Sequence, residues 1–144
     1  MKHIKTLAIT LCLLGANTAF GADWTPHLKM MQNDCANFGG YGDIMKLIGE
    51  GKKTNMPKKL QADIVKYTYK DDEIDIRLKN ATAFGQPITR IVAEYPPTSY
   101  VALHIYFTNG NFSKIKPKLK PNKGNFRTLG FDSKNKKITC TLSD

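Results

Sequence analysis

Residues 65–78 read VKYTYKDDEIDIRL. Apolar or aromatic side chains alternate with charged or hydroxyl-bearing ones on both sides of Asp71-Asp72, which is the pattern of two half-buried β-strands joined by a tight turn. We therefore predict a hairpin with one wet face. Its other face would carry Val65, Tyr67, Tyr69, Ile74, Ile76 and Leu78.

Alternation of the same kind returns in two later pairs of segments, 88–95 with 100–107 and 126–131 with 137–142. Pro96 to Ser99 and Asp132 to Asn135 would supply the connecting turns. Asn109-Gly110, which follows the second pair, is the strongest short turn signal in the chain. We expect an antiparallel meander sheet of about six strands.

Two short helices are predicted before the sheet. The first begins at residues 24–26, where Thr25 would cap it and Pro26 suits the first turn. The second covers residues 43–48, and the apolar faces of the two helices carry Leu28, Met31, Cys35, Ile44, Leu47 and Ile48. The expected fold class is α+β, with both helices packed on one sheet face in a cystatin-like or similar arrangement.

The first 21 residues have the three parts of a cleavable signal peptide: a positive start, an apolar stretch and small residues at the end. The apolar stretch is only about ten residues long, too short for a membrane-spanning helix. Ala19 and Gly21 place small side chains where the peptidase needs them, so we predict cleavage after Gly21. Residues 22–144 would then form a single periplasmic or secreted domain.

Two cysteines, Cys35 and Cys140, remain after the leader with Cys12 is removed. In an exported protein two such thiols are expected to pair, because the compartment is oxidising. The rival interpretation, a catalytic thiol, lacks an identifiable histidine with an orienting carboxylate. We predict a Cys35–Cys140 disulfide that ties the first helix to the last strand.

Positive charge is concentrated in the last quarter of the chain. Residues 22–110 hold 11 basic and 10 acidic groups, whereas residues 111–144 hold 9 and 2. Lysines occupy every second position from 114 to 120, with two prolines in the same segment, which predicts an exposed, extended ribbon. The candidate partner-binding residues are Lys114, Lys116, Lys118, Lys120, Lys123 and Arg127.

Two interpretations of these lysines remain open. They could protect a sheet edge from aggregation, which is a common use of edge lysines. Alternatively, they could attract an acidic partner, namely a protein, lipid phosphates or an anionic glycan. Nucleic acid is the weakest candidate, because the segment lacks an aromatic platform on which bases could stack.

Catalytic and metal-binding signals are sparse. Only His27 and His104 remain after the leader, in no spacing that would hold a metal ion. No serine lies in a Gly-x-Ser-x-Gly motif. The acidic cluster at residues 71–75 is typical of a solvated turn whose charges are neutralised by cross-strand cations. We expect neither an enzyme nor a cofactor.

The sequence thus favours an exported, non-enzymatic binding protein of the bacterial cell envelope. Its most specific form is an inhibitor or immunity-type protein that presents a basic loop and a sheet face to an acidic protein. The alternative is a secreted polyanion-binding or adhesin-like protein that uses the same lysines on lipid or glycan. These alternatives differ in their dependence on salt, since bare polyanion binding weakens steeply as salt rises.

Overall fold

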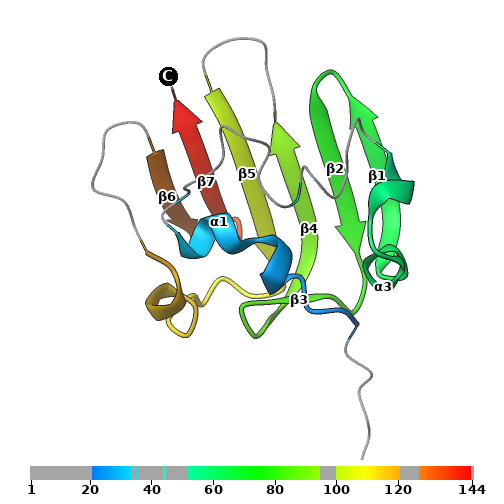
Figure 1. Ribbon diagram of the computed structural model, residues 1–144. Coiled ribbons are helices and arrows are strands. Elements are labelled where there is room, and N and C mark those ends of the chain that lie inside the picture. The colour runs from blue at the N-terminus through cyan, green and yellow to red at the C-terminus, as the bar shows by residue number, and fades with distance from the viewer. Residues whose placement is uncertain are drawn as a thin grey trace, which may run out of the picture.

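The computed structural model describes residues 21–33, 35, 44, 52–94, 100–120 and 127–143. Its main feature is a seven-stranded antiparallel sheet in the order β1-β2-β4-β5-β7-β6, with the short β3 paired to β4 beside this path (Figure 1). The strands are β1 (Ile64–Lys70), β2 (Glu73–Leu78), β3 (Thr82–Ala83), β4 (Gln86–Glu94), β5 (Tyr100–Phe107), β6 (Arg127–Asp132) and β7 (Lys137–Ser143). The predicted antiparallel sheet is confirmed.

The first two strands form the predicted hairpin. Tyr67 pairs with Ile76 across β1 and β2, so the alternating apolar positions of the two strands share a face. Asp71 and Asp72 turn the chain with φ values of 51° and 59°. Positive φ at both central residues is the requirement of the turn that best matches the twist of a hairpin, and aspartate tolerates it better than most residues.

β1 is an edge strand, and part of its predicted buried face is exposed. The pairing register shifts between Ile64 and Lys66, so Val65 lies at an irregularity and is 65% exposed. Tyr69, next to the turn, is 53% exposed. The predicted burial of these two side chains was wrong, because strict alternation fails at the irregularity beside Val65 and because Tyr69 lies near the end of an edge strand.

The strand order is not the simple meander that we expected. β5 pairs with β7, and β6 lies outside β7 at the other edge of the sheet. Asn109 and Gly110 therefore do not join two neighbouring strands but begin the long connection to β6. The Asn109 side chain accepts a hydrogen bond from the Asn111 amide at 2.6 Å, and a Cβ at Gly110 would collide with the Ser133 carbonyl. Neither Asn109 nor Gly110 has a positive φ, so the Asn-Gly turn that the sequence suggested does not form.

The short strand β3 and its tight turn into β4 lie within residues 79–86, for which the sequence pattern predicted no strand. Phe84 and Gly85 make this turn with φ values of 53° and 77°. The N-terminal segment lies parallel to β3 through a bridge between Asp23 and Thr82. A strand of two residues is too short to show an alternating sequence pattern, and this is why β3 was not predicted.

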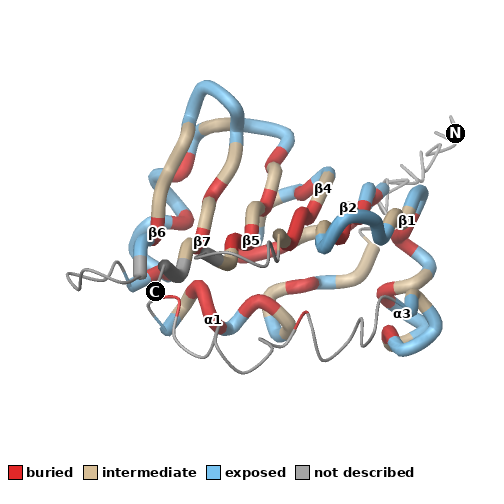
Figure 2. The backbone as a smooth tube through the Cα atoms, turned by 90° about the horizontal axis from the view of Figure 1, so that it is seen from above, coloured by how far each residue is buried: buried red, intermediate tan, exposed pale blue. Residues whose placement is uncertain are grey.

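The helices lie on one side of the sheet (Figure 2). They are α1 (Lys29–Gln32) and α3 (Lys58–Gln61), with 3-10 turns η1 (Thr25–His27), η3 (Lys53–Asn55) and η4 (Lys116–Lys118). α3 was not predicted, yet it buries Leu60 completely. Of the second predicted helix, only Ile44 lies within the described residues, where it is helical and buried.

The first predicted helix is shorter and capped differently than expected. A 3-10 turn and a single α-turn replace one continuous helix, and the residue at the N-cap is Trp24, without a side-chain cap. The hydroxyl of Thr25 instead donates to Asp23 and accepts the Phe84 amide, both at 2.6 Å. Thr25 thus ties the N-terminal segment to the β3–β4 turn.

The core fills the space between the helical layer and one face of the sheet. Its largest fully buried side chains are Trp24, Leu28, Met31, Ile44, Leu60, Ile74, Ile76, Ile91, Leu103, Ile105 and Ile115. The predicted disulfide is confirmed: Cys35 and Cys140 are bonded, both are buried, and their Cα atoms are 5.6 Å apart. It fixes the segment after α1 to the middle of β7.

With α1 and α3 each only one turn long, the described part of the chain is mostly β rather than α+β. The sheet, the one-sided helical cover and the disulfide agree with the sequence analysis. The helical content is lower than predicted, because apolar positions at helical spacing also fit a 3-10 turn followed by one α-turn.

The disulfide closes a loop with a sequence separation of 105 residues. Replacing both cysteines by alanine should lower the free energy of unfolding by about 4–5 kcal/mol, because the unfolded chain regains the entropy that the cross-link removes. Urea denaturation of the native and double-variant proteins measures this difference. A loss below about 1 kcal/mol would contradict a major role for loop closure.

Candidate binding surface

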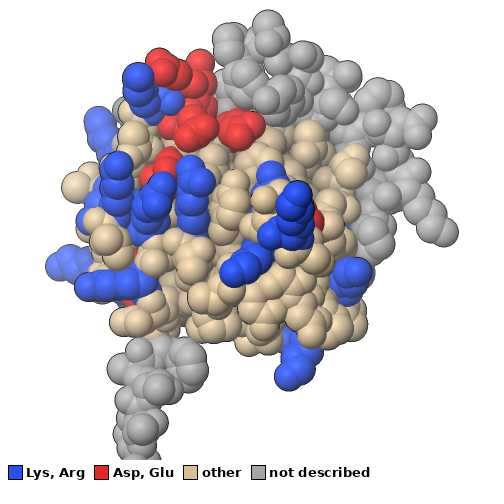
Figure 3. Space-filling model, turned by 180° about the vertical axis from the view of Figure 1, so that it is seen from behind, with Lys and Arg blue, Asp and Glu red and all other residues tan. Residues whose placement is uncertain are grey.

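The sheet has a second face, opposite the helices, that carries a row of cations. The cross-strand pairs place one residue of each of six strands in a line, which we name the cationic row: Lys66, Arg77, Arg90, Tyr106, Lys137 and Asp132. Figure 3 views this face, and basic side chains stand next to one another across it. The sheet thus aligns cations that are far apart in the sequence.

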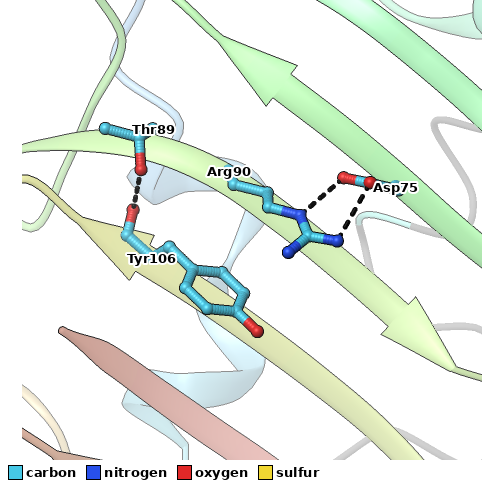
Figure 4. A network of polar contacts seen from close by, with 4 residues as sticks. All are labelled: Asp75, Thr89, Arg90 and Tyr106. Carbon is cyan, nitrogen blue, oxygen red and sulfur yellow. Dashed lines mark hydrogen bonds and ion pairs between the residues drawn. The ribbon is translucent and has the colours of Figure 1, made fainter. Parts of the chain in front are cut away.

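Arg90 is the best-fixed cation of the row (Figure 4). Its Nε and Nη2 atoms donate to the two oxygens of Asp75 at 2.8 and 3.0 Å, and its guanidinium lies 5.2 Å from the centre of the Tyr106 ring. The hydrogen bond to Asp75 raises the pKa of Arg90. Lys137 lies 6.0 Å from the same ring. Paired hydrogen bonds and ring contacts of this kind hold a cation in one orientation.

His104 lies in the neighbouring row on the same face. Its Nε2 atom is 3.3 Å from Glu94 Oε1, and its Nδ1 atom is 2.9 Å from the Thr139 hydroxyl. Burial lowers the pKa of His104, and the charges of Lys137 and Arg90 act in the same direction, whereas Glu94 opposes them. The net shift favours the neutral imidazole.

Charge is separated between the two ends of the sheet. Asp71, Asp72, Glu73 and Glu94 lie where β1 meets β2 and where β4 ends. The opposite end, which we name the basic end, carries Lys79, Lys114, Lys116, Lys118, Lys120, Lys134, Lys136 and Lys137. Figure 3 shows the acidic patch above the basic side chains.

The lysine segment contributes four of these residues, but it is not the extended ribbon that we predicted. It folds into a turn and the η4 helix, which buries Ile115 and Leu119 and leaves Pro117 exposed. The apolar side chains act as anchors that close the end of the core. The lysines consequently project around a helical turn instead of along one edge.

Two lysines of this segment have partners within the molecule. Lys118 donates from Nζ to the Phe84 carbonyl at 3.0 Å, and the Lys116 ammonium lies 5.2 Å from the centre of the Phe131 ring. Lys114 and Lys120 are exposed. The segment is not itself a strand at either edge of the main sheet path, β1 or β6.

The other candidate residues are less defined. Lys123 lies outside the described residues, as do residues 1–20 of the predicted leader and the predicted turn at residues 96–99. Arg127 begins β6, and its backbone pairs with Leu142. The structure therefore brings together four of the six predicted partner-binding residues at the basic end.

The acidic cluster at residues 71–75 behaves largely as predicted. Asp71 and Asp72 are exposed in the turn, and Lys70 lies 3.4 Å from Asp71. Asp75, however, is neutralised by Arg90 of β4 and not by a cation of the same hairpin. Among the residues that the structure describes, no three histidine, cysteine or acidic side chains form a group suited to a metal ion.

The line of Thr139, His104 and Glu94 resembles the nucleophile, base and acid of a hydrolase. Thr139 lies inside β7, which is paired with β5 on one side and β6 on the other. The two ladders occupy the neighbouring backbone groups, so none is available to stabilise an oxyanion. What the structure shows is a chain of polar contacts from Glu94 through His104 to Thr139.

Sequence reasoning missed Arg90, Tyr106 and Lys137 as members of one surface. Tyr106 lies between the buried Ile105 and Phe107, whereas Arg90 has the same parity as Ile88 and follows a register shift between Ile88 and Arg90. Their alignment depends on the register between strands, which a single sequence does not give.

No protein-family model, curated protein or solved structure matches the chain. Among the described residues, no helix is long and apolar enough to cross a membrane.

The lowered pKa of His104 predicts a loss of stability in mild acid. The unfolded chain takes up this proton near pH 6.5, whereas the native state resists it, so the contribution is complete above that pH and is lost as the pH falls toward the native pKa. Urea denaturation at pH 7.5 and 5.0 should show a larger loss for the native protein than for His104→Gln. Equal losses in the two proteins would contradict the lowered pKa.

Proposed function

We propose that the chain is an exported, non-enzymatic binding protein of the bacterial cell envelope, and that it holds an acidic protein in the manner of an inhibitor or immunity-type protein. The contact would include the basic end and the adjoining cationic row. We also propose that the helices pack on the sheet in a cystatin-like arrangement.

The observation that carries this proposal is the separation of charge. Eight lysines gather on the basic end, and Asp132, which pairs with Lys137 there, accepts two hydrogen bonds from Asn135. A surface of one sign attracts a partner of the other sign and raises the association rate. The acidic end would repel the same partner, which gives the complex an orientation.

The rigidity of the surface supports a protein partner. Asp75 and Tyr106 hold Arg90 in place, and the buried Ile115 and Leu119 anchor the lysine segment. Side chains that are already ordered lose less entropy on binding. A preformed surface of this kind is common in inhibitor complexes, whose backbones move little on association.

A second candidate, binding of an anionic lipid or glycan, is favoured by one observation. Every cation of the basic end is a lysine. Lysine is a flexible point charge that suits a diffuse anionic surface, whereas arginine is preferred for planar, two-pronged contacts.

The first test compares two variants that lose the same charge. Lys114, Lys116 and Lys120 are changed to glutamine in one variant, which spares Lys118 because its amine is bonded within the molecule. The matched control changes Lys29, Lys58 and Lys59, which lie on the helical side. The oxidised mature proteins are immobilised and incubated with envelope and culture-supernatant proteins at 50 and 200 mM salt.

We expect an acidic protein to remain bound to the native and control proteins at both salt concentrations. Its affinity for the variant with Lys114, Lys116 and Lys120 changed to glutamine should fall by at least about tenfold. Heparin and vesicles containing phosphatidylglycerol serve as probes for the second candidate. Retention of these probes alone, lost steeply as salt rises, would favour polyanion binding. Identical retention by all three proteins would exclude the lysine segment from the contact.

A further inference from the structure

Asp63 is the only charged residue that is buried in the described part of the chain, with 6% of its surface exposed. It follows α3 and directly precedes β1. Within the same part of the chain, no lysine or arginine side chain forms an ion pair with it. A buried carboxylate without a countercharge is costly, so the groups that surround Asp63 need an explanation.

The groups that bond to its side chain come from the N-terminal segment. The backbone nitrogen of Ala22 donates to Asp63 Oδ2 at 2.8 Å, and the indole Nε1 of Trp24 donates to the same oxygen at 3.3 Å. Both donors are neutral. The site is therefore shaped for a nitrogen donor and holds a carboxylate that would gain from a cation.

The Ala22 nitrogen is held in this position by residues that follow it. The Ala22 carbonyl accepts the Thr82 amide at 3.2 Å, and the Trp24 amide donates to the Thr82 carbonyl at 2.8 Å. Trp24 is completely buried. Removal of the chain before Ala22 would leave these contacts in place.

Gly21 fits tightly against the same carboxylate. Its amide donates to the Asn80 carbonyl at 2.6 Å, and a Cβ at this position would collide with Asp63 Oδ1. Loss of residue 21 would therefore free space beside Asp63 Oδ1 and leave the Asn80 carbonyl without this donor. The predicted cleavage point, between Gly21 and Ala22, coincides with this contact.

We propose that Asp63 is the binding site for the α-ammonium group that processing creates at Ala22. A signal peptidase hydrolyses the Gly21–Ala22 bond with one water molecule; Gly21 leaves with the new carboxylate, and Ala22 keeps the amine, which takes up a proton at neutral pH. The neutral amide donor at Asp63 is thereby replaced by a cation with three N–H groups. A charge-assisted hydrogen bond is stronger than the neutral one that it replaces.

This inference rests on the proposed export of the chain but not on the identity of its partner. Its consequence is that removal of the leader completes the fold. The ion pair joins the first residue of the mature chain to the start of β1 and lies against Trp24, in the core. A chain that keeps additional residues before Ala22 lacks this pair.

The test produces the whole chain, with its leader, in an exporting bacterium. A second variant carries Ser-Gly inserted between Gly21 and Ala22, so that processing leaves the amine two residues away from Asp63. Each is also made with Asp63→Asn, and intact-mass measurement identifies the N-terminus of every purified protein. Urea denaturation then gives the unfolding equilibrium constants of the four proteins.

We expect the native protein to begin at Ala22. The Ser-Gly insertion should raise the unfolding equilibrium constant by about tenfold or more. With Asp63→Asn the same insertion should change it by less than about twofold, since the amine then has no charged partner. Trp24, the single tryptophan, adds a spectroscopic signal, because the insertion alters the carboxylate to which its indole donates.

A chemical measurement keeps the test decisive if Asp63→Asn does not fold. An amine-reactive acetylating reagent at pH 7 should modify the α-amine of the native protein at least about tenfold more slowly than that of the insertion variant, because an ammonium that is paired with a carboxylate and partly buried is protected. A leader that is still attached would overturn both export and this inference. An N-terminus at Ala22 with equal reactivity and no coupling, or an N-terminus at another residue, would overturn the inference alone.

Discussion

The structure depends on covering one face of the antiparallel sheet. Ile76, Ile91 and Ile105 form an apolar surface that the sheet alone would expose to water, and the helical cover consists mainly of single turns. Such short helices are not stable by themselves. The Cys35–Cys140 disulfide and the backbone bonds between residues 21–24 and 80–82 therefore hold the cover in place.

The parts of the fold that sequence predicted are those governed by local periodicity and by compartment. The β1–β2 hairpin and the alternation of β5 followed from the sequence pattern, and the Cys35–Cys140 pairing followed from the number of cysteines together with the predicted export. The position of β6 outside β7, the bulge at Val65 and the helix α3 depend on packing between distant segments. Such features leave little trace in local sequence.

The candidate surface shows the same division. Charge counts located the lysine segment but could not show that Ile115 and Leu119 would anchor it as a helical turn. The cationic row depends on the register of six strands, and the role of Asp63 depends on contacts across 41 residues of sequence. In each case the sequence supplies the residue types, while their juxtaposition comes from the assembled sheet.

The opposed charges of the two sheet ends give the described part of the chain a permanent electric dipole. In the field of a negatively charged surface such a body experiences a torque before any atoms touch, and this torque turns the lysine-bearing end toward the surface. Rotational search, which normally slows the docking of two specific patches, would be shortened at low ionic strength. The arrangement of charge thus gives the protein a preferred orientation as it approaches an acidic partner.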